Sequence, residues 1–216
     1  MSTPPPGARA YDSPLRREQA AATEQRILRA AYDLLVSDGY GGTTMAAVAA
    51  RAGVSVQTVY KAVGSKPALV KRVYDVTLVG DDEPVPFAQR PEVQAAYAEV
   101  DPTLFLAAYA GLGKLLNTRL SPLLSILLAG ARTGDPDLVA FAATTDGERL
   151  VGASMVASRL EGLGALRPGL TVDEARDLVW TINSPEVWHL LVERQGWTAD
   201  AWEAWVTRAL VASVLA

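Results

Sequence analysis

Several residue types that commonly build binding sites are scarce or absent in this chain. It contains no cysteine and a single histidine, His189. Disulfide bonds are therefore excluded, and so are the zinc and iron sites that need thiolates or paired histidines. A metal site would have to be built from carboxylates alone, and no such cluster stands out. We expect no metal and no cofactor.

Long apolar runs are also missing. The longest, residues 123–131, is too short to cross a bilayer. The first ten residues are polar and rich in proline, without the apolar segment of a signal peptide. We therefore expect a soluble, cytoplasmic protein with no membrane partner.

The residues that are present predict a chain with a substantial core and an uneven charge. Of the 216 residues, 50% are hydrophobic and 20% are charged, which is enough for a small head and a larger body. Residues 1–79 hold ten Lys or Arg and six Asp or Glu, whereas residues 80–216 hold ten and eighteen. An excess of four positive charges is ordinary by itself. It gains weight because it coincides with the motif described next.

Residues 43–63 carry the pattern of two short helices joined by a tight turn. The first helix has apolar residues at helical spacing, namely Met45, Val48, Ala49 and Ala52. Thr44 precedes them as a candidate N-cap. Gly53 follows where a helix commonly ends in a left-handed residue.

The second short helix is expected to start at Val56, after the N-cap candidate Ser55. Its predicted inner face consists of Val56, Val59 and Val63. Its predicted outer face consists of Gln57, Thr58 and Lys61, with Tyr60 at the edge. Two short helices, a glycine turn and an outer face of amide, hydroxyl and ammonium groups predict a helix-turn-helix that enters a major groove.

Together with its flanks, this segment resembles the N-terminal domain of TetR-family transcriptional regulators. The residues that carry the resemblance are Ile27-Leu28, Ala30-Ala31, Gly39-Tyr40, Thr43-Thr44-Met45, Val48-Ala49, Ala52-Gly53-Val54-Ser55, Thr58-Val59-Tyr60, Ser65-Lys66 and Ala68-Leu69. The chain departs from the family pattern at Gln57, Lys61, Val63 and Pro67. These departures leave the predicted fold intact, and two of them change the chemistry of the outer face.

The rest of the chain is expected to be helical as well. Asp or Ser directly before proline marks helix starts at Pro102, Pro122, Pro136 and Pro185. We predict helices at residues 23–37, 65–79, 102–119, 122–132, 136–163, 171–183, 185–195 and 198–214, with a loop at 39–42. No alternating pattern competes, so the predicted fold is all-α.

The expected organisation has three parts. Residues 1–20 form a disordered arm, residues 21–80 form a three-helix helix-turn-helix head that binds DNA, and residues 81–216 form a larger C-terminal domain of about six helices. The acidic, proline-containing stretch at 81–86 marks the boundary. By resemblance, the C-terminal domain binds a small molecule and forms a homodimer through its last two helices, at about residues 171–215.

The expected DNA contacts come from the motif and its flank. They are Thr44, Val56, Gln57, Thr58, Tyr60, Lys61 and Lys66. Gln57 suits adenine, and Lys61 suits guanine or a phosphate. The resemblance implies that Tyr60 and Lys66 hold the DNA backbone.

The candidate residues for an effector pocket are the aromatic and polar side chains of the body. They are Phe105, Tyr109, Asn117, Phe141, Trp180 and His189. Each aromatic residue could equally be plain core, and His189 could belong to the core or an interface. The resemblance implies a dimeric repressor that leaves a pseudo-palindromic operator when an effector binds.

Two other functions remain as alternatives. An enzyme lacks support, since Ser154 has no second glycine of a nucleophile elbow. A helical dimer that has lost DNA binding is a second alternative. The polar, cationic outer face with Gln57 and Lys61 argues against this second alternative.

Overall fold

The computed structural model describes residues 14–80 and 85–216, which form helices joined by turns and loops. The helices are α1 (Pro14–Gly42), α2 (Met45–Ala52), α3 (Val56–Val63), α4 (Lys66–Val79), the 3₁₀ turn η1 (Phe87–Gln89), α5 (Pro91–Ala98), α6 (Pro102–Arg132), α7 (Pro136–Gly162), α8 (Val172–Ile182), α9 (Pro185–Trp188), the π-helical segment η2 (His189–Arg194) and α10 (Ala199–Val214). Within the described residues there is no strand, only an isolated bridge between Leu166 and Leu215. No helix in this part of the chain has the length and apolarity needed to cross a membrane.

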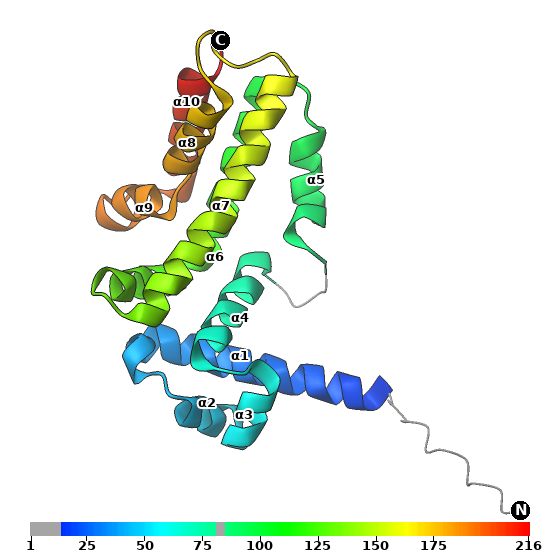
Figure 1. Ribbon diagram of the computed structural model, residues 1–216, viewed down its shortest axis with the longest axis vertical. Coiled ribbons are helices and arrows are strands. Elements are labelled where there is room, and N and C mark those ends of the chain that lie inside the picture. Colours follow the sequence, from blue (N-terminus) through cyan, green and yellow to red (C-terminus); the bar gives the residue numbers. More distant parts are fainter. Residues whose placement is uncertain (1–13, 81–84) are drawn as a thin grey trace, which may run out of the picture.

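The molecule is elongated, with a head at one end and an upright body above it (Figure 1). Helices α1, α2 and α3 form the head, and α4 rises from it towards the body. The long helices α6 and α7 run side by side along the body. Helix α5 lies on one side of this pair, and α8, α9 and α10 lie on the other. The all-α expectation, with a helix-turn-helix head and a larger helical body, is confirmed.

The head is held together by the apolar stripes that the sequence displays. Ile27 and Leu35 of α1 are fully buried, as are Val48 of α2 and Val59 of α3. Leu69 of α4 is 1% exposed and joins the same cluster. Helices this short are marginal in isolation, so burial of these side chains supplies most of their stability.

Caps fix where the short helices begin and end. The hydroxyls of Thr44, Ser55 and Ser65 accept hydrogen bonds from backbone N–H groups two or three residues into α2, α3 and α4. Gly53 adopts φ 66° and ψ 40°, and its N–H donates to the carbonyls of Ala49 and Ala50. A residue with a Cβ would be strained in this left-handed conformation, so glycine suits the turn.

The upper body has its own apolar core around two tryptophans. Trp188 and Trp202 are buried, with ring centroids 5.1 Å apart in an edge-to-face arrangement. Phe105 of α6 and Val179 of α8 belong to the same cluster. Aromatic burial on this scale ties α6, α8, α9 and α10 together.

Three predicted helix boundaries are wrong. Helix α1 begins at Pro14 rather than residue 23, so residues 14–20 are helical, while residues 1–13 of the expected arm lie outside the described residues. Gly39, with φ 72° and ψ 177°, interrupts α1, and the expected loop at 39–42 continues as one helical turn to Gly42. The predicted helices 102–119 and 122–132 are a single helix, α6, which runs through Pro122.

The reason that α6 continues past Pro122 is tertiary packing. A proline inside a helix costs about 3 kcal/mol because it removes a hydrogen bond and crowds the preceding turn. Leu120, Leu123, Leu124 and Leu127 are all buried along one face of α6 around this point. Their burial outweighs the local cost, whereas the Ser-Pro pair alone indicated a helix start.

Two further segments differ from the prediction. Residues 87–89 and 91–98 form η1 and α5, although no helix was predicted there. The predicted helix 185–195 is divided into the four-residue α9 and the π-helical η2. Residues 81–84 of the predicted boundary lie outside the described residues.

Candidate DNA-binding face and effector cavity

The outer face of α3 consists of Val56, Gln57, Tyr60, Lys61 and Ala62, which are all exposed. Tyr60 is 53% exposed and Val56 is 40% exposed. Val56 therefore does not lie on the inner face as predicted, because the first turn of α3 projects beyond the core that encloses Val59. An exposed apolar methyl group, an amide, a phenol and an ammonium share one helix face.

Thr58 and Thr44 are engaged in capping. The Thr58 hydroxyl lies 2.8 Å from the Ser55 hydroxyl, which also accepts a hydrogen bond from the Thr58 N–H. The Thr44 hydroxyl accepts from the Ala47 N–H at 3.1 Å and remains at the exposed N-terminus of α2. Thr44 and Ser55 cap the two helix N-termini, where free N–H groups favour an anion.

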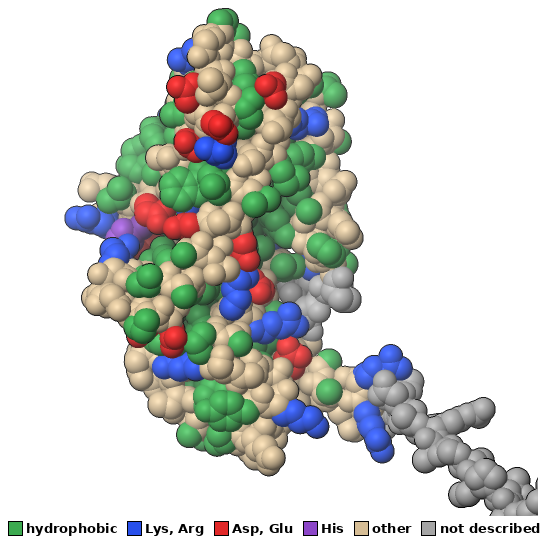
Figure 2. Space-filling view, viewed as in Figure 1, with side chains coloured by type: hydrophobic (Ala, Val, Ile, Leu, Met, Phe, Trp, Pro, Cys, Tyr) green, Lys and Arg blue, Asp and Glu red, His purple; other side chains and the backbone are tan. Residues whose placement is uncertain are grey.

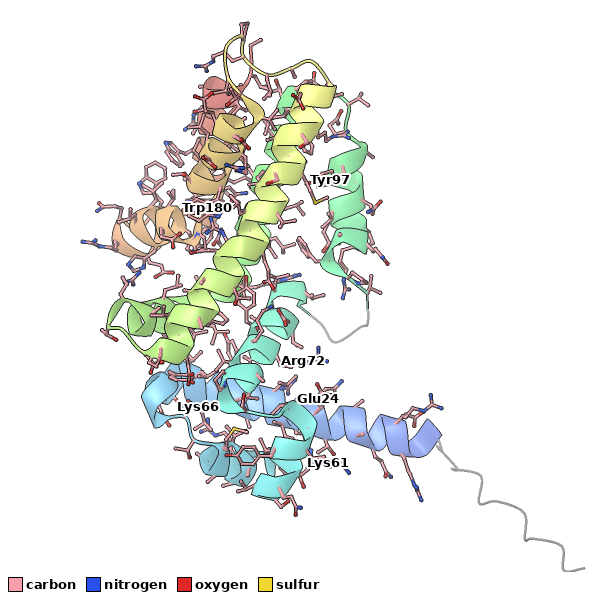
Figure 3. All side chains as sticks on the ribbon, viewed as in Figure 1. Glu24, Lys61, Lys66, Arg72, Tyr97 and Trp180 are labelled. Carbon is pink, nitrogen blue, oxygen red and sulfur yellow. The ribbon has the colours of Figure 1, made fainter. Side chains whose placement is uncertain are left out.

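Lys66 does not point outward with the α3 face. Its ammonium donates to the Tyr40 carbonyl at 2.5 Å and lies 3.8 Å from the centroid of the Tyr40 ring. The Tyr40 hydroxyl in turn donates to Asp137 Oδ2 at 2.6 Å. Burial lowers the pKa of Lys66, while Asp135 and Asp137 oppose this shift. Lys66 therefore takes part in a contact between the head and the start of α7; its position at the beginning of α4 is visible in Figure 3.

The charge of the surface follows the division seen in the sequence. Lys and Arg side chains lie over the head and its surroundings in Figure 2, and most of the acidic side chains in this view lie over the body. Not every head cation is free, since Arg72 Nε lies 3.0 Å from Glu24 Oε1. Lys61 on α3 is exposed and extends the positive surface at the far end of the head.

A cavity of about 520 Å³ lies in the body directly above the head. Helices α4, α5, α6, α7 and α8 and the start of α9 enclose it. Tyr74, Leu78 and Val79 of α4 line its lower side. The same helix carries Leu69 and Val73 of the head core, so one rigid element joins the cavity to the head.

The predicted pocket residues divide into three groups. Tyr109, Asn117 and Trp180 line the cavity. Phe105 and Phe141 lie outside its lining: Phe105 is fully buried beside Tyr97, and Phe141 packs edge-on against Tyr74 at 5.4 Å. They are core aromatics, which was the alternative considered for every aromatic candidate.

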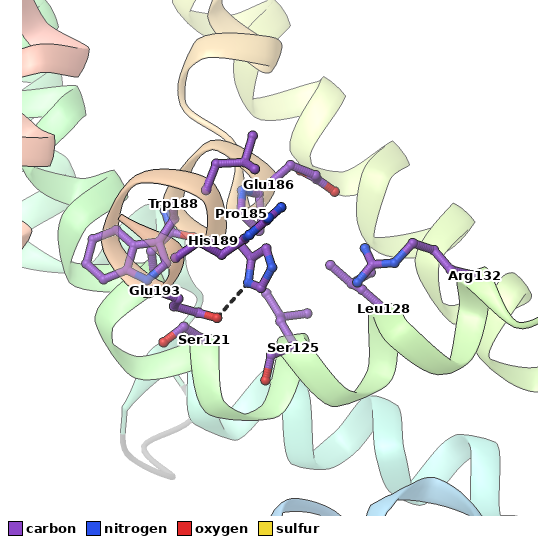
Figure 4. Close-up of a pocket in the computed structure, with 13 residues that line it drawn as sticks. Ser121, Ser125, Leu128, Arg132, Pro185, Glu186, Trp188, His189 and Glu193 are labelled. Atoms are coloured by element: carbon purple, nitrogen blue, oxygen red, sulfur yellow. Dashed lines mark hydrogen bonds and ion pairs between the residues drawn. The ribbon is translucent and has the colours of Figure 1, made fainter. Parts of the chain in front are cut away.

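His189 lines a second, adjoining hollow of about 380 Å³ between α6 and the α9–η2 segment (Figure 4). Its Nδ1 lies 2.7 Å from Glu193 Oε2, one helical turn away. Asn117, Leu124 and Glu186 line both hollows. His189 thus lies beside the larger cavity rather than in it.

Polar groups in the larger cavity form a linked set. The Tyr109 hydroxyl lies within hydrogen-bonding reach of the Asn183 side chain, and burial raises the pKa of Tyr109 to about 12. The Arg149 guanidinium donates to the Trp180 carbonyl at 2.8 Å and to Asp146 at 3.1 Å. A neutral phenol, an amide and a guanidinium are therefore available in a largely apolar chamber.

Arg149 and Asn183 were missed as cavity residues. Arg149 lies in an otherwise unremarkable charged stretch of α7, and its role depends on the distant Trp180. Asn183 ends α8 as its C-cap residue, and that local role gives no sign of a cavity. The adjacent Ser184-Pro185 pair predicted a helix start at Pro185, not a cavity.

The fold and these surfaces define a helix-turn-helix protein with a helical, cavity-containing body. Residues 27–73 match the family model described as "Bacterial regulatory proteins, tetR family". Solved structures with this fold cover about nine-tenths of the chain. The matched segment, residues 27–73, belongs to the DNA-binding domain of TetR-family transcriptional regulators.

Three solved structures illustrate the match. A protein from Rhodococcus sp. assigned to the TetR family has a TM-score of 0.70 at 13% identity, with 91% of this chain and all of that chain (100%) covered. The SmeT–triclosan complex has a TM-score of 0.66 at 20% identity, with 90% and 92% covered. A regulator from Saccharomonospora viridis in complex with choline has a TM-score of 0.65 at 15% identity, with 91% and 99% covered. At these identities the likeness concerns the fold alone, and no curated protein matches the chain.

Proposed function

We propose that the protein is a ligand-responsive repressor that binds a pseudo-palindromic operator as a homodimer and leaves it when a small molecule occupies the body. The observation that carries this proposal is the position of α4. Its N-terminal half packs in the head beside α1 and α3, and its C-terminal half lines the 520 Å³ cavity. A ligand in the cavity therefore contacts the helix that holds the DNA-binding head.

The outer face of α3 enters the major groove in this proposal. Gln57 hydrogen-bonds to adenine, Lys61 donates to guanine or a phosphate, and Val56 contacts a thymine methyl group. Phosphates are held by Tyr60 and by the N-termini of two helices. These are the N-terminus of α2, which Thr44 caps, and the N-terminus of α3, which has Thr58 in its first turn. Lys66 reaches a phosphate only if it leaves Tyr40, so its role in DNA binding is indirect, through the position of α4.

The dimer forms through α8 and α10, at about residues 171–215. Support comes from the exposed face of α10, where Ala201, Ala204 and Ala212 are small enough for close approach of a second helix. Trp205 is half-buried at the edge of this face and offers a large apolar contact. Two heads held in this way meet half-sites about one helical turn apart or a multiple of it.

The dimer has two conformations that differ in the distance between the two heads, and the effector binds one conformation more tightly than the other. A ligand shifts such an equilibrium only by its difference in affinity for the two states. Triclosan in SmeT and choline in the Saccharomonospora viridis regulator support an effector site in bodies of this fold. A regulator of this kind works in the cytoplasm, where the chromosome lies.

The test is binding to DNA that flanks the protein's own gene, titrated from low to physiological salt. We expect two chains per site and an affinity that falls steeply with salt, because each neutralised phosphate releases counterions. The double variant Gln57→Ala/Lys61→Ala should lose about tenfold or more in affinity for the selected sequence.

The matched control is Arg194→Ala/Gln195→Ala, which removes the same two kinds of side chain from an exposed part of the body. It should bind like the unaltered chain. If random-site selection also yields no preferred sequence, or if both double variants bind equally well, the proposal is wrong and the helical dimer without sequence-specific DNA binding becomes the better interpretation.

A further inference from the structure

The cavity of the body is walled by aromatic rings. Its lining includes the rings of Tyr74, Phe87, Tyr97, Tyr109 and Trp180. In the view of Figure 3, Tyr97 and Trp180 approach from opposite sides of α7. Aromatic faces carry partial negative charge, so a chamber with several rings suits an apolar group and attracts a cation.

Four carboxylates also line the cavity, more than its cations balance. They are Asp75, Asp146, Glu148 and Glu186. Lys71 forms ion pairs with two of them, since its ammonium lies 2.5 Å from Asp75 and 2.9 Å from Glu148. Arg149 forms ion pairs with the other two, since its guanidinium lies 3.1 Å from the Asp146 carboxylate and 4.0 Å from the Glu186 carboxylate. Two cations thus face four formal negative charges.

Arg149 is the cation of the lining, and it is poorly placed to bind an anionic ligand. Its guanidinium lies 4.8 Å from the Trp180 ring and donates to the Trp180 carbonyl as well as to Asp146. An anion would have to break these contacts and would then lie near the remaining carboxylates. A cation gains from the same carboxylates without displacing Arg149.

The cavity also contains a buried acceptor that lacks a donor. Asn183 Oδ1 has no hydrogen-bond partner among the described residues. It lies against Gly113 of α6, where a Cβ atom would come within 2.1 Å. An unpaired buried acceptor is unfavourable, and the N–H of a protonated amine would supply the missing donor.

We propose that the effector is an organic cation with an aromatic or similarly apolar body, held by the ring walls and the excess carboxylates of this cavity. The inference rests on the proposed function, because it identifies the class of molecule that occupies the effector site. It also makes a claim about binding that can be measured on the full chain without DNA.

The experiment compares two ions of nearly equal size and shape and opposite charge, tetraphenylphosphonium and tetraphenylborate. Calorimetric titration of the full-length protein with each should show tighter binding of the phosphonium ion, by about tenfold or more. Equal affinities, tighter binding of tetraphenylborate, or no binding of either ion at millimolar concentration would overturn the inference.

Two variants and one control locate the effect. Glu148→Gln and Glu186→Gln each remove a lining carboxylate, and each should weaken phosphonium binding about three- to tenfold while leaving tetraphenylborate binding equal or stronger. Glu161→Gln removes an exposed carboxylate of α7 outside the lining and should change neither affinity. Phosphonium binding unchanged in both lining variants would also overturn the inference.

Operator binding is measured separately with the same ions. Phosphonium binding without operator release leaves the cation site standing and contradicts ligand-controlled release. The reverse result is operator release by a neutral or anionic compound that binds this cavity, in a protein that does not prefer the phosphonium ion. It supports ligand-controlled release and contradicts the cation site.

Discussion

At the scale of single residues, the contact of Tyr40 with Asp137 joins parts of the chain that are 97 positions apart. The Tyr40 ring is buried and also carries the Lys66 ammonium on its face. Sequence patterns identify Gly39-Tyr40 as part of the head and Asp135-Pro136 as a helix start. They contain nothing that pairs the two, because the pairing depends on how α4 and α6 hold the head against α7.

The variant Tyr40→Phe tests this contact. It removes the hydroxyl and keeps the ring, so the free energy of unfolding should fall by about 1.5–3 kcal/mol, as for loss of a hydrogen bond to a charged partner. Urea denaturation followed by circular dichroism measures the change. Tyr32→Phe, on the half-buried side of α1, serves as control and should have little effect; equal stability of all three proteins would contradict a stabilising contact.

At the scale of helices, local sequence signals fix some helix boundaries, and tertiary packing overrides them at others. Thr44, Gly53 and Ser55 fix α2 and α3 by local chemistry, and the sequence predicts both helices closely. Pro122 fails as a helix start because the buried leucines around it stabilise one long α6. Helix α5 has little amphipathic pattern and only Val93 and Ala96 buried, so its helical period was not recognisable.

The same limit applies to the candidate site. The outer face of α3 depends on helical periodicity within eight residues, and the sequence therefore indicates most of it. The cavity depends on which aromatics of separate helices converge. Tyr109 and Trp180 converge there, whereas Phe105 and Phe141 pack in the core, and spacing along the chain cannot separate these two cases.

Gly113 of α6 provides a test of helix packing at the cavity. A Cβ at this position would lie 2.1 Å from Asn183 Oδ1, so Gly113→Ala must displace Asn183 and should lower the free energy of unfolding by about 1–3 kcal/mol. Gly147→Ala in α7 is the control: no atom lies within 4 Å of its added Cβ. It should stabilise the protein by about 0.5–1 kcal/mol through helix propensity. Thermal and urea unfolding of both variants measure these changes in stability. Loss of stability in Gly147→Ala but not in Gly113→Ala would contradict the close packing of Gly113 against Asn183.

At the scale of the whole molecule, buried tyrosines make stability depend on alkaline pH. Burial raises the pKa of Tyr40, Tyr74, Tyr97 and Tyr109 above the ordinary value of 10.0. In the unfolded chain these phenols lose their protons at about pH 10, while in the folded chain they keep them. Deprotonation therefore favours the unfolded state, and the stabilising effect of the neutral phenols is lost as the pH rises.

We expect the free energy of unfolding to be nearly constant from about pH 8 to 9 and to fall between about pH 10 and 12. Urea titrations across this range, with tyrosinate absorbance near 295 nm recorded in parallel, measure both the stability and the ionisation. Tyr60→Phe, which alters an exposed phenol, controls for the effect of a tyrosine substitution as such. A stability that stays constant to pH 12 would refute the argument.

The apolar cluster of the head does not stop at the head. It continues through Leu120, Leu123 and Leu127 of α6 to Leu138 and Phe141 of α7, whereas the upper body has a separate cluster around Trp188 and Trp202. Backbone amides of α1, α4 and the lower part of α6 should therefore exchange with deuterium through one shared opening event. Helix α6 then spans two cooperative units, and their boundary falls within this helix, above the DNA-binding motif and close to the cavity.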